Sequence, residues 1–155
     1  MGREVRRVPK GWKHPMENGK YKPLLGRSYS DEAADFLSMA NKQGLQEAVD
    51  YYGRAPDVND YMPEWPESER THLMMYEDTS EGTPISPAFE TPEELARWLA
   101  DNGASAFGSM TASYEEWLAT CKGAWAPSMV MEGNRMMSGV EFTARRAVGK
   151  SGEQT

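Results

Sequence analysis

Three side chains in this sequence have the chemistry for nucleophilic catalysis or for binding a transition metal: His14, His72 and Cys121. The two histidines lie 58 positions apart, and no short His/Cys spacing of the kind found in zinc sites connects them to the cysteine. Cys121 falls on the apolar face of an expected helix beside Trp117, which favours a buried core thiol over an activated nucleophile. We therefore expect neither a metal nor a cofactor.

Recognised catalytic signatures are also missing from the sequence. It contains no phosphate-binding loop, no hydrolase nucleophile elbow, no dinucleotide-binding glycine pattern and no zinc-protease motif. These observations favour a binding protein over an enzyme. One alternative remains open, a small enzyme or ligand-binding domain whose pocket lies between two tryptophan-bearing helices and a C-terminal hairpin. Such a site would use His72, Tyr76 or Cys121.

Charge is distributed unevenly along the chain. The net charge is -7, yet residues 1–30 hold eight bases and two acids, whereas residues 47–94 hold 13 acids and two bases. A dense acidic surface can imitate nucleic acid and occupy the nucleic-acid channel of another protein. The candidate partner-binding surface consists of Asp57, Asp60, Glu64, Glu67, Glu69, Glu77, Asp78 and Glu81.

The basic first 29 residues are predicted to form an extended arm that packs on the rest of the protein. Prolines and glycines recur too often in this stretch for a regular helix. A second alternative function follows, because basic side chains interleaved with aromatic ones can bind nucleic acid. The candidate contacts of the arm are Arg3, Arg6, Arg7 and Trp12.

Capping signals in the sequence predict three helices. Ser30 is a predicted N-cap for a helix over 30–44, which Gly44 would end. Thr91, Pro92 and Glu94 predict a helix over 91–103, and Ser113 with Glu116 forms the capping box of a helix over 113–122.

Strand signals are weaker. Residues 71–79 are predicted to form a strand that a turn over 79–87 would end. Residues 126–132 and 136–142 are predicted to form a hairpin around Gly133-Asn134, and 143–155 a flexible tail. Together the patterns predict an α+β domain over 30–142, in which a small antiparallel sheet carries about three short helices on one face. Because the chain holds 11 Met, 7 Tyr and 5 Trp but few aliphatic residues, we expect a core of thioethers and aromatic rings.

The sequence also indicates the cellular compartment of the protein. No apolar run is long enough to cross a bilayer, and the first residues lack the apolar segment of a signal peptide. A single cysteine suits a reducing compartment, so we expect a cytoplasmic protein without membrane contact.

Four stretches of the sequence carry a resemblance to a known group of proteins: REVRRVPKGWKHP, YMPEWPESERTHLMMYEDTSEGTPISP, TPEELARWLADNGASAFG and SGVEF. They resemble a family of short uncharacterised proteins that recur in tailed phages, prophages and integrated mobile elements, and they span Arg3 to Phe142. The resemblance implies an accessory role in the life of a mobile element. Combined with the acidic middle, it leads us to expect a protein that binds a host protein or complex, such as a nuclease or a defence complex, and inhibits it.

Overall fold

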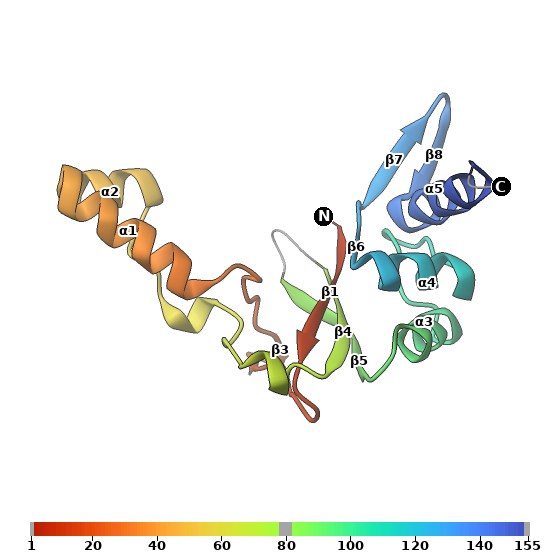
Figure 1. The fold of residues 1–155 in the computed structure, drawn as a ribbon, viewed down its shortest axis with the longest axis horizontal. Helices are drawn as coiled ribbons and strands as arrows, with labels where there is room; N and C mark the ends of the chain where they lie inside the picture. Colours follow the sequence, from red (N-terminus) through yellow and green to blue (C-terminus); the bar gives the residue numbers. More distant parts are fainter. Residues whose placement is uncertain (1, 78–81, 154–155) are drawn as a thin grey trace. The chain divides into compact units, whose positions relative to one another are not determined.

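The computed structural model describes residues 2–77 and 82–153 (Figure 1). Contacts divide the chain into two compact units, one formed by Met1–Lys22 with Trp65–Thr155 and the other by Pro23–Glu64. This division differs from the expected arm over 1–29 and domain over 30–142. The first 22 residues belong to the larger unit because they supply one of its strands.

The fold is α+β, as predicted. The larger unit contains a four-stranded sheet in the order β5-β4-β1-β6, and all its pairs are antiparallel (Figure 1). Its strands are β1 (Arg3–Val8), β4 (His72–Glu77), β5 (Thr83–Phe89) and β6 (Trp125–Ala126). The described residues include five α-helices rather than about three, and three of the five correspond to the predicted ones.

Strand β1 corrects the prediction of an arm that packs over the sheet. It lies inside the sheet, paired with β4 on one side and β6 on the other, with Val5 opposite Met75. The three arginines of β1 concealed the strand pattern in the sequence. Pro9 follows the last residue of β1 and has no N–H to continue the ladder.

Strand β4 confirms the predicted strand over 71–79 as far as Glu77, and residues 78–81 lie outside the described residues. The second half of the predicted turn over 79–87 is wrong. Residues Thr83–Phe89 form β5, an edge strand that tolerates Pro84 and Pro87 because an edge does not need every N–H. The pairing with β4 is irregular between Met74 and Tyr76. There the Met75 N–H donates to the Ser86 hydroxyl, 2.9 Å away, which replaces a ladder bond.

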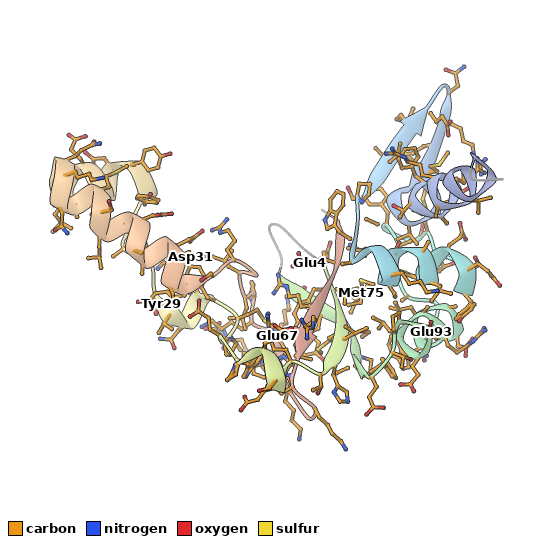
Figure 2. The ribbon with its side chains drawn as sticks, in the orientation of Figure 1. Glu4, Tyr29, Asp31, Glu67, Met75 and Glu93 are labelled. Atoms are coloured by element: carbon orange, nitrogen blue, oxygen red, sulfur yellow. The ribbon has the colours of Figure 1, made fainter. Side chains whose placement is uncertain are left out.

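Two capped helices pack on one face of the sheet. Helix α3 (Pro92–Asp101) begins after Thr91, whose side chain accepts from the Glu94 N–H, and α4 (Tyr114–Gly123) begins with the predicted Ser113–Glu116 capping box. Both helices confirm the sequence prediction within two residues. The core between helices and sheet is formed by Met75 of β4 (Figure 2), several aliphatic residues of α3, and the following buried side chains of α4: Trp117 and Cys121.

The C-terminal region differs from the prediction after its first strand. Strands β7 (Met129–Glu132) and β8 (Arg135–Ser138) form the expected hairpin as a separate two-stranded sheet. Helix α5 (Gly139–Glu153) then replaces the end of the predicted second strand and the predicted flexible tail as far as Glu153, and residues 154–155 of that tail lie outside the described residues. The Ser138 hydroxyl accepts from the Glu141 N–H and starts this helix, and buried Val140 joins the core.

The smaller unit consists of two consecutive helices and a turn. Helix α1 (Tyr29–Gln43) is the predicted helix over 30–44, but its N-cap is Ser28 rather than Ser30. Gly44, with φ of 98°, separates it from α2 (Leu45–Tyr52), and the 3₁₀ helix η1 (Val58–Asp60) follows. The buried side chains of this unit are few: Leu24, Phe36, Ala48 and Tyr61.

No helix in the described residues combines the length and the apolar character that spanning a membrane requires.

Candidate functional site

The residues with catalytic potential do not form a reactive site in the structure. Cys121 is 5% exposed in the core, and desolvation, together with the nearby charge of Glu93, raises the pKa of its thiol to about 12. A thiol with so high a pKa is not a nucleophile at neutral pH. His72 lies on β4, where its Nδ1 is 2.8 Å from the hydroxyl of Thr71. Within the described residues, no group of three or more His, Cys, Asp or Glu side chains is placed to hold a metal ion.

The acidic candidates of the smaller unit hold their own backbone in place. Asp57 Oδ1 accepts from the Asn59 N–H at 2.9 Å and caps η1. Asp60 pairs with Arg54 at 2.5 Å. Glu64 accepts from the hydroxyl of Ser28 at 2.6 Å, and hydrogen bonds from Ser28 and Ser30 lower the pKa of its carboxyl. These three carboxylates are therefore structural as well as acidic.

The acidic candidates of the larger unit are partly neutralised. Glu67 binds both Arg7 and Arg70, and these hydrogen bonds lower the pKa of its carboxyl. Glu77 lies 3.6 Å from Arg3. Glu69 lies in the short 3₁₀ helix η2 (Glu67–Glu69). Asp78 and Glu81 fall outside the described residues.

The basic candidates are likewise used within the fold. Arg3 is 4% exposed, and its Nε donates to the Ser105 carbonyl oxygen at 2.9 Å. Arg6 pairs with Glu4 at 2.5 Å and lies 4.3 Å over the ring of Tyr76. Arg7 binds Glu67, as described above. The geometry therefore gives no support to nucleic-acid binding by a free basic arm.

An acidic surface with exposed tyrosines is found instead on α1 and α2. We call it the acidic tyrosine face and define it as Glu32 and Asp35 of α1 with Glu47, Tyr51 and Tyr52 of α2. The rings of Tyr51 and Tyr52 have their centroids 4.8 Å apart, and Tyr51 is 73% exposed. Desolvation raises the pKa of Tyr52, and the negative charges of Asp35 and Glu32 raise it further. Glu47 and Tyr51 are one helical turn apart and share a side of α2.

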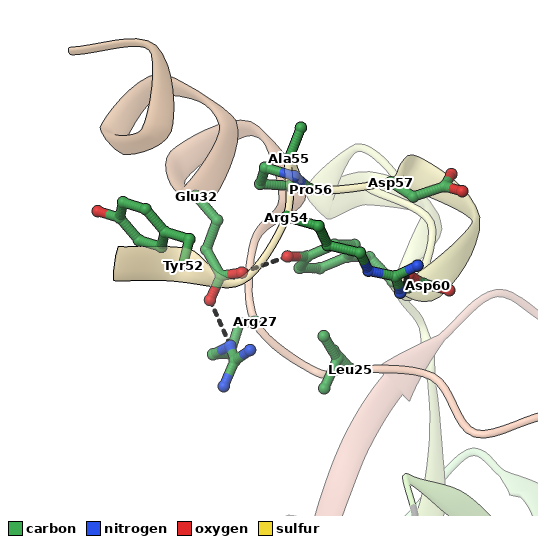
Figure 3. A pocket seen from close by; sticks show the side chains of 10 residues that line it. Leu25, Arg27, Glu32, Tyr52, Arg54, Ala55, Pro56, Asp57 and Asp60 are labelled. Atoms are coloured by element: carbon green, nitrogen blue, oxygen red, sulfur yellow. Dashed lines mark hydrogen bonds and ion pairs between the residues drawn. The ribbon is translucent and has the colours of Figure 1, made fainter. Parts of the chain in front are cut away.

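A polar pocket of about 300 Å³ lies beside this face within the smaller unit (Figure 3). Glu32 accepts a hydrogen bond from the Tyr61 hydroxyl and pairs with Arg27, and both contacts are drawn in Figure 3. Arg54 and Asp60 form a second ion pair in its wall. Both arginines of the pocket are therefore paired with carboxylates of its own wall, which weakens the attraction of the pocket for an anion.

A second hollow, in the larger unit, contains groups that the sequence analysis assigned to the arm. We call it the aromatic groove, a space of about 590 Å³ bordered by part of the segment 12–21, by residues 84–87 of β5, by Met74 and by Trp98 of α3. Its inner wall holds a hydrogen-bonded chain. His14 Nε2 is 2.5 Å from the Lys22 carbonyl oxygen, His14 Nδ1 is 3.0 Å from the Tyr76 hydroxyl, and the Trp12 indole N–H donates to that hydroxyl at 3.2 Å.

This chain fixes the proton positions on His14. The Lys22 carbonyl only accepts, so Nε2 carries the proton and Nδ1 accepts from Tyr76. Desolvation is the main reason that the pKa of His14 is lowered, and the charge of Arg6 lowers it further, although the Lys22 carbonyl opposes both effects. Desolvation also raises the pKa of Tyr76. In the sequence, this site is indicated only by the close spacing of Trp12, His14 and Tyr21. The hydrogen-bond partner of His14, Tyr76, lies far along the chain.

Comparison of the chain with models of protein families, with curated proteins and with solved structures finds no match.

Proposed function

We propose that this protein is a non-enzymatic binding protein that uses the acidic tyrosine face of α1 and α2 to engage a basic surface on a partner protein. The observation that carries the proposal is the combination of exposed tyrosine rings with the exposed carboxylates of Asp35 and Glu47 on two adjacent helices. Such a surface suits the recognition of a basic surface on another protein.

Charge supports a basic partner. The 42 residues of Pro23–Glu64 hold eight acids and three bases, although they make up a small part of the chain. Opposite charges steer association and raise its rate, an effect that salt weakens. A protein surface that normally binds nucleic acid has the required positive charge.

The tyrosines support a protein rather than a small ion as the partner. Tyr51 has the largest exposed fraction of the aromatic side chains in the described residues, and Leu45 at the start of α2 is also exposed. Tyrosine is enriched among the side chains that dominate the binding energy of protein interfaces, because its ring buries a large area while its hydroxyl stays hydrated. The ring of Tyr51 is therefore the expected anchor.

The resemblance of the sequence to short proteins of phages and mobile elements is the reason for placing the partner in the host cytoplasm. A basic channel that binds nucleic acid is a feature of nucleases and defence complexes, so occupation of that channel would inhibit them. The protein then acts as an accessory factor of a mobile element that inhibits a host nuclease or defence complex.

Affinity capture from a host lysate treated with nuclease tests the proposal. The captured protein is identified by mass spectrometry, purified and titrated with wild type at low and moderate salt. We expect Glu47→Lys and Tyr51→Ala each to raise Kd about tenfold, equivalent to about 1.4 kcal/mol. Duplex DNA is expected to compete with the protein for the partner.

Glu90→Lys is the matched control, because Glu90 is an exposed carboxylate of the larger unit and its reversal changes the net charge equally. It is expected to leave Kd unchanged at moderate salt. Equal losses for Glu47→Lys and Glu90→Lys would indicate a general charge effect and contradict the proposed face. Failure to capture any partner at either salt concentration would contradict the function.

A further inference from the structure

The aromatic groove of the larger unit is separate from the proposed partner-binding face and has the dimensions of a ligand site. Its volume of about 590 Å³ falls within the usual range for pockets that bind small molecules. Three aromatic side chains border it: Trp12 and Tyr21 from the N-terminal segment and Trp98 from α3. Tyr21 is 47% exposed and Met16 is 58% exposed, so apolar surface remains uncovered at its rim.

The wall that carries Trp12 is held in a fixed position. Its indole N–H donates to Tyr76, and its ring lies edge-on to Trp65 with a centroid distance of 4.7 Å. His14, which is 5% exposed, uses both ring nitrogens within the protein. A preformed wall loses little conformational entropy when a ligand binds. Because the polar atoms of Trp12 and His14 are already bonded, this wall offers ring faces rather than hydrogen-bonding groups.

The charge at the groove differs from that of the chain as a whole. The chain carries -7, yet the residues that border the groove include no carboxylate, and Lys13 is the one with a permanent charge. The nearby Arg6 is paired with Glu4 at 2.5 Å. His14 is neutral at pH 7, since burial lowers its pKa. A positive charge beside apolar ring faces complements a flat apolar group that bears a negative charge.

We infer that the aromatic groove binds a planar aromatic anion, with its ring among Trp12, Tyr21 and Trp98 and its negative group beside Lys13. The inference is independent of the proposed function, because the two sites lie in different units and use different residues.

Three probes test the inference on the full chain: naphthoate, naphthalenemethanol and naphthylmethylamine. They share the naphthalene ring system and differ in charge. Isothermal titration is expected to rank the anion first, the alcohol second and the cation last. Lys13→Met is expected to weaken naphthoate binding about three- to fivefold, the value of an exposed ion pair, and to leave the alcohol unchanged. Lys10→Met is the matched control, since Lys10 is an exposed lysine outside the residues that border the groove, and it is expected to change neither affinity.

Wild-type NMR spectra provide a second readout that does not depend on variant folding. Naphthoate is expected to shift the indole N–H signals of Trp12 and Trp98 and to leave the signal of Trp117, which is fully buried in the core. Tyr21→Ala is expected to weaken all three probes. The inference is overturned if binding does not saturate, if the anion has no advantage over the alcohol, if Lys13→Met and Lys10→Met act alike, or if Trp12 and Trp98 do not respond.

Discussion

The Tyr76 hydroxyl lies 3.0 Å from His14 Nδ1, and this contact joins residues 62 positions apart in the chain. Tyr76 follows Met75 on β4, so its side chain points to the sheet face opposite α3 and α4. Helices cover one face of the sheet, and the segment that contains Trp12 and His14 closes over Tyr76 on the other. Tyr76 is fully buried as a result.

Tyr76→Phe tests how much the hydrogen bonds of the Tyr76 hydroxyl stabilise the folded protein. The substitution removes the hydroxyl and leaves His14 Nδ1 and the Trp12 indole N–H without their partner in a buried site. We expect a loss of about 1–3 kcal/mol in the free energy of unfolding, measured by urea denaturation. Tyr21→Phe, which removes the hydroxyl of an exposed tyrosine, is the control and is expected to be nearly neutral. Equal effects of the two variants would contradict this role of the Tyr76 hydroxyl.

The free energy of unfolding is expected to depend on the protonation of His14. Its pKa in the folded state is below the ordinary value of 6.5, so the unfolded chain binds more protons as pH falls below 6.5. Stability is therefore expected to be constant with respect to His14 above that pH and to decrease as pH falls from 6.5 toward the folded pKa.

Urea denaturation across this pH window, with NMR titration of the His14 ring, measures the effect. His72→Gln is the control and is expected to retain the wild-type dependence. A His14 ring that titrates above 6.5 in the folded protein would reverse the predicted sign.

Cys121 is expected to be protected from alkylation in the native protein. Burial raises the pKa of its thiol to about 12, and access requires opening of the core that contains Trp117. The alkylation rate, followed by mass spectrometry at neutral pH, is expected to track unfolding as urea is added. Rapid modification without urea would contradict the buried position and return attention to a reactive thiol.

Ser113→Ala tests the cap of α4. The Ser113 hydroxyl accepts from the Glu116 N–H at 3.2 Å, and Glu116 accepts from the Ser113 N–H at 2.9 Å. Loss of the cap is expected to cost about 1 kcal/mol in the free energy of unfolding. Ser109→Ala, at an exposed position outside the helix, is expected to cost little. A neutral Ser113→Ala variant would show that the capping box adds no stability.

Gly139→Ala tests the close approach at the start of α5. A Cβ at this position would lie 1.6 Å from the carbonyl oxygen of Pro127, a backbone atom that cannot rotate away. We expect a loss of about 3 kcal/mol or failure to fold, measured by thermal unfolding. Gly123→Ala is the control, because a Cβ there meets nothing within 4 Å. A stable Gly139→Ala variant would show that the Pro127 backbone and the start of α5 can separate.

The sequence alone determined the parts of this protein that depend on neighbouring residues. Helices α3 and α4 were predicted because their caps, Thr91 and Ser113, act on an N–H three residues away. The position of Cys121 in the core followed from the helical spacing of α4. These signals are local, and the tertiary structure did not override them.

Only the tertiary structure decided the central position of β1, the helical state of α5, and the residues that come together in the acidic tyrosine face and the aromatic groove. Val5 pairs with Met75, and His14 binds Tyr76, so both contacts join segments that the sequence separates widely. Arginines concealed β1 because Tyr76 and Glu67, which stabilise Arg6 and Arg7, lie on those distant segments. Local pattern cannot show which distant group will neutralise a charge or complete a hydrogen bond, because that depends on the folded position of the chain.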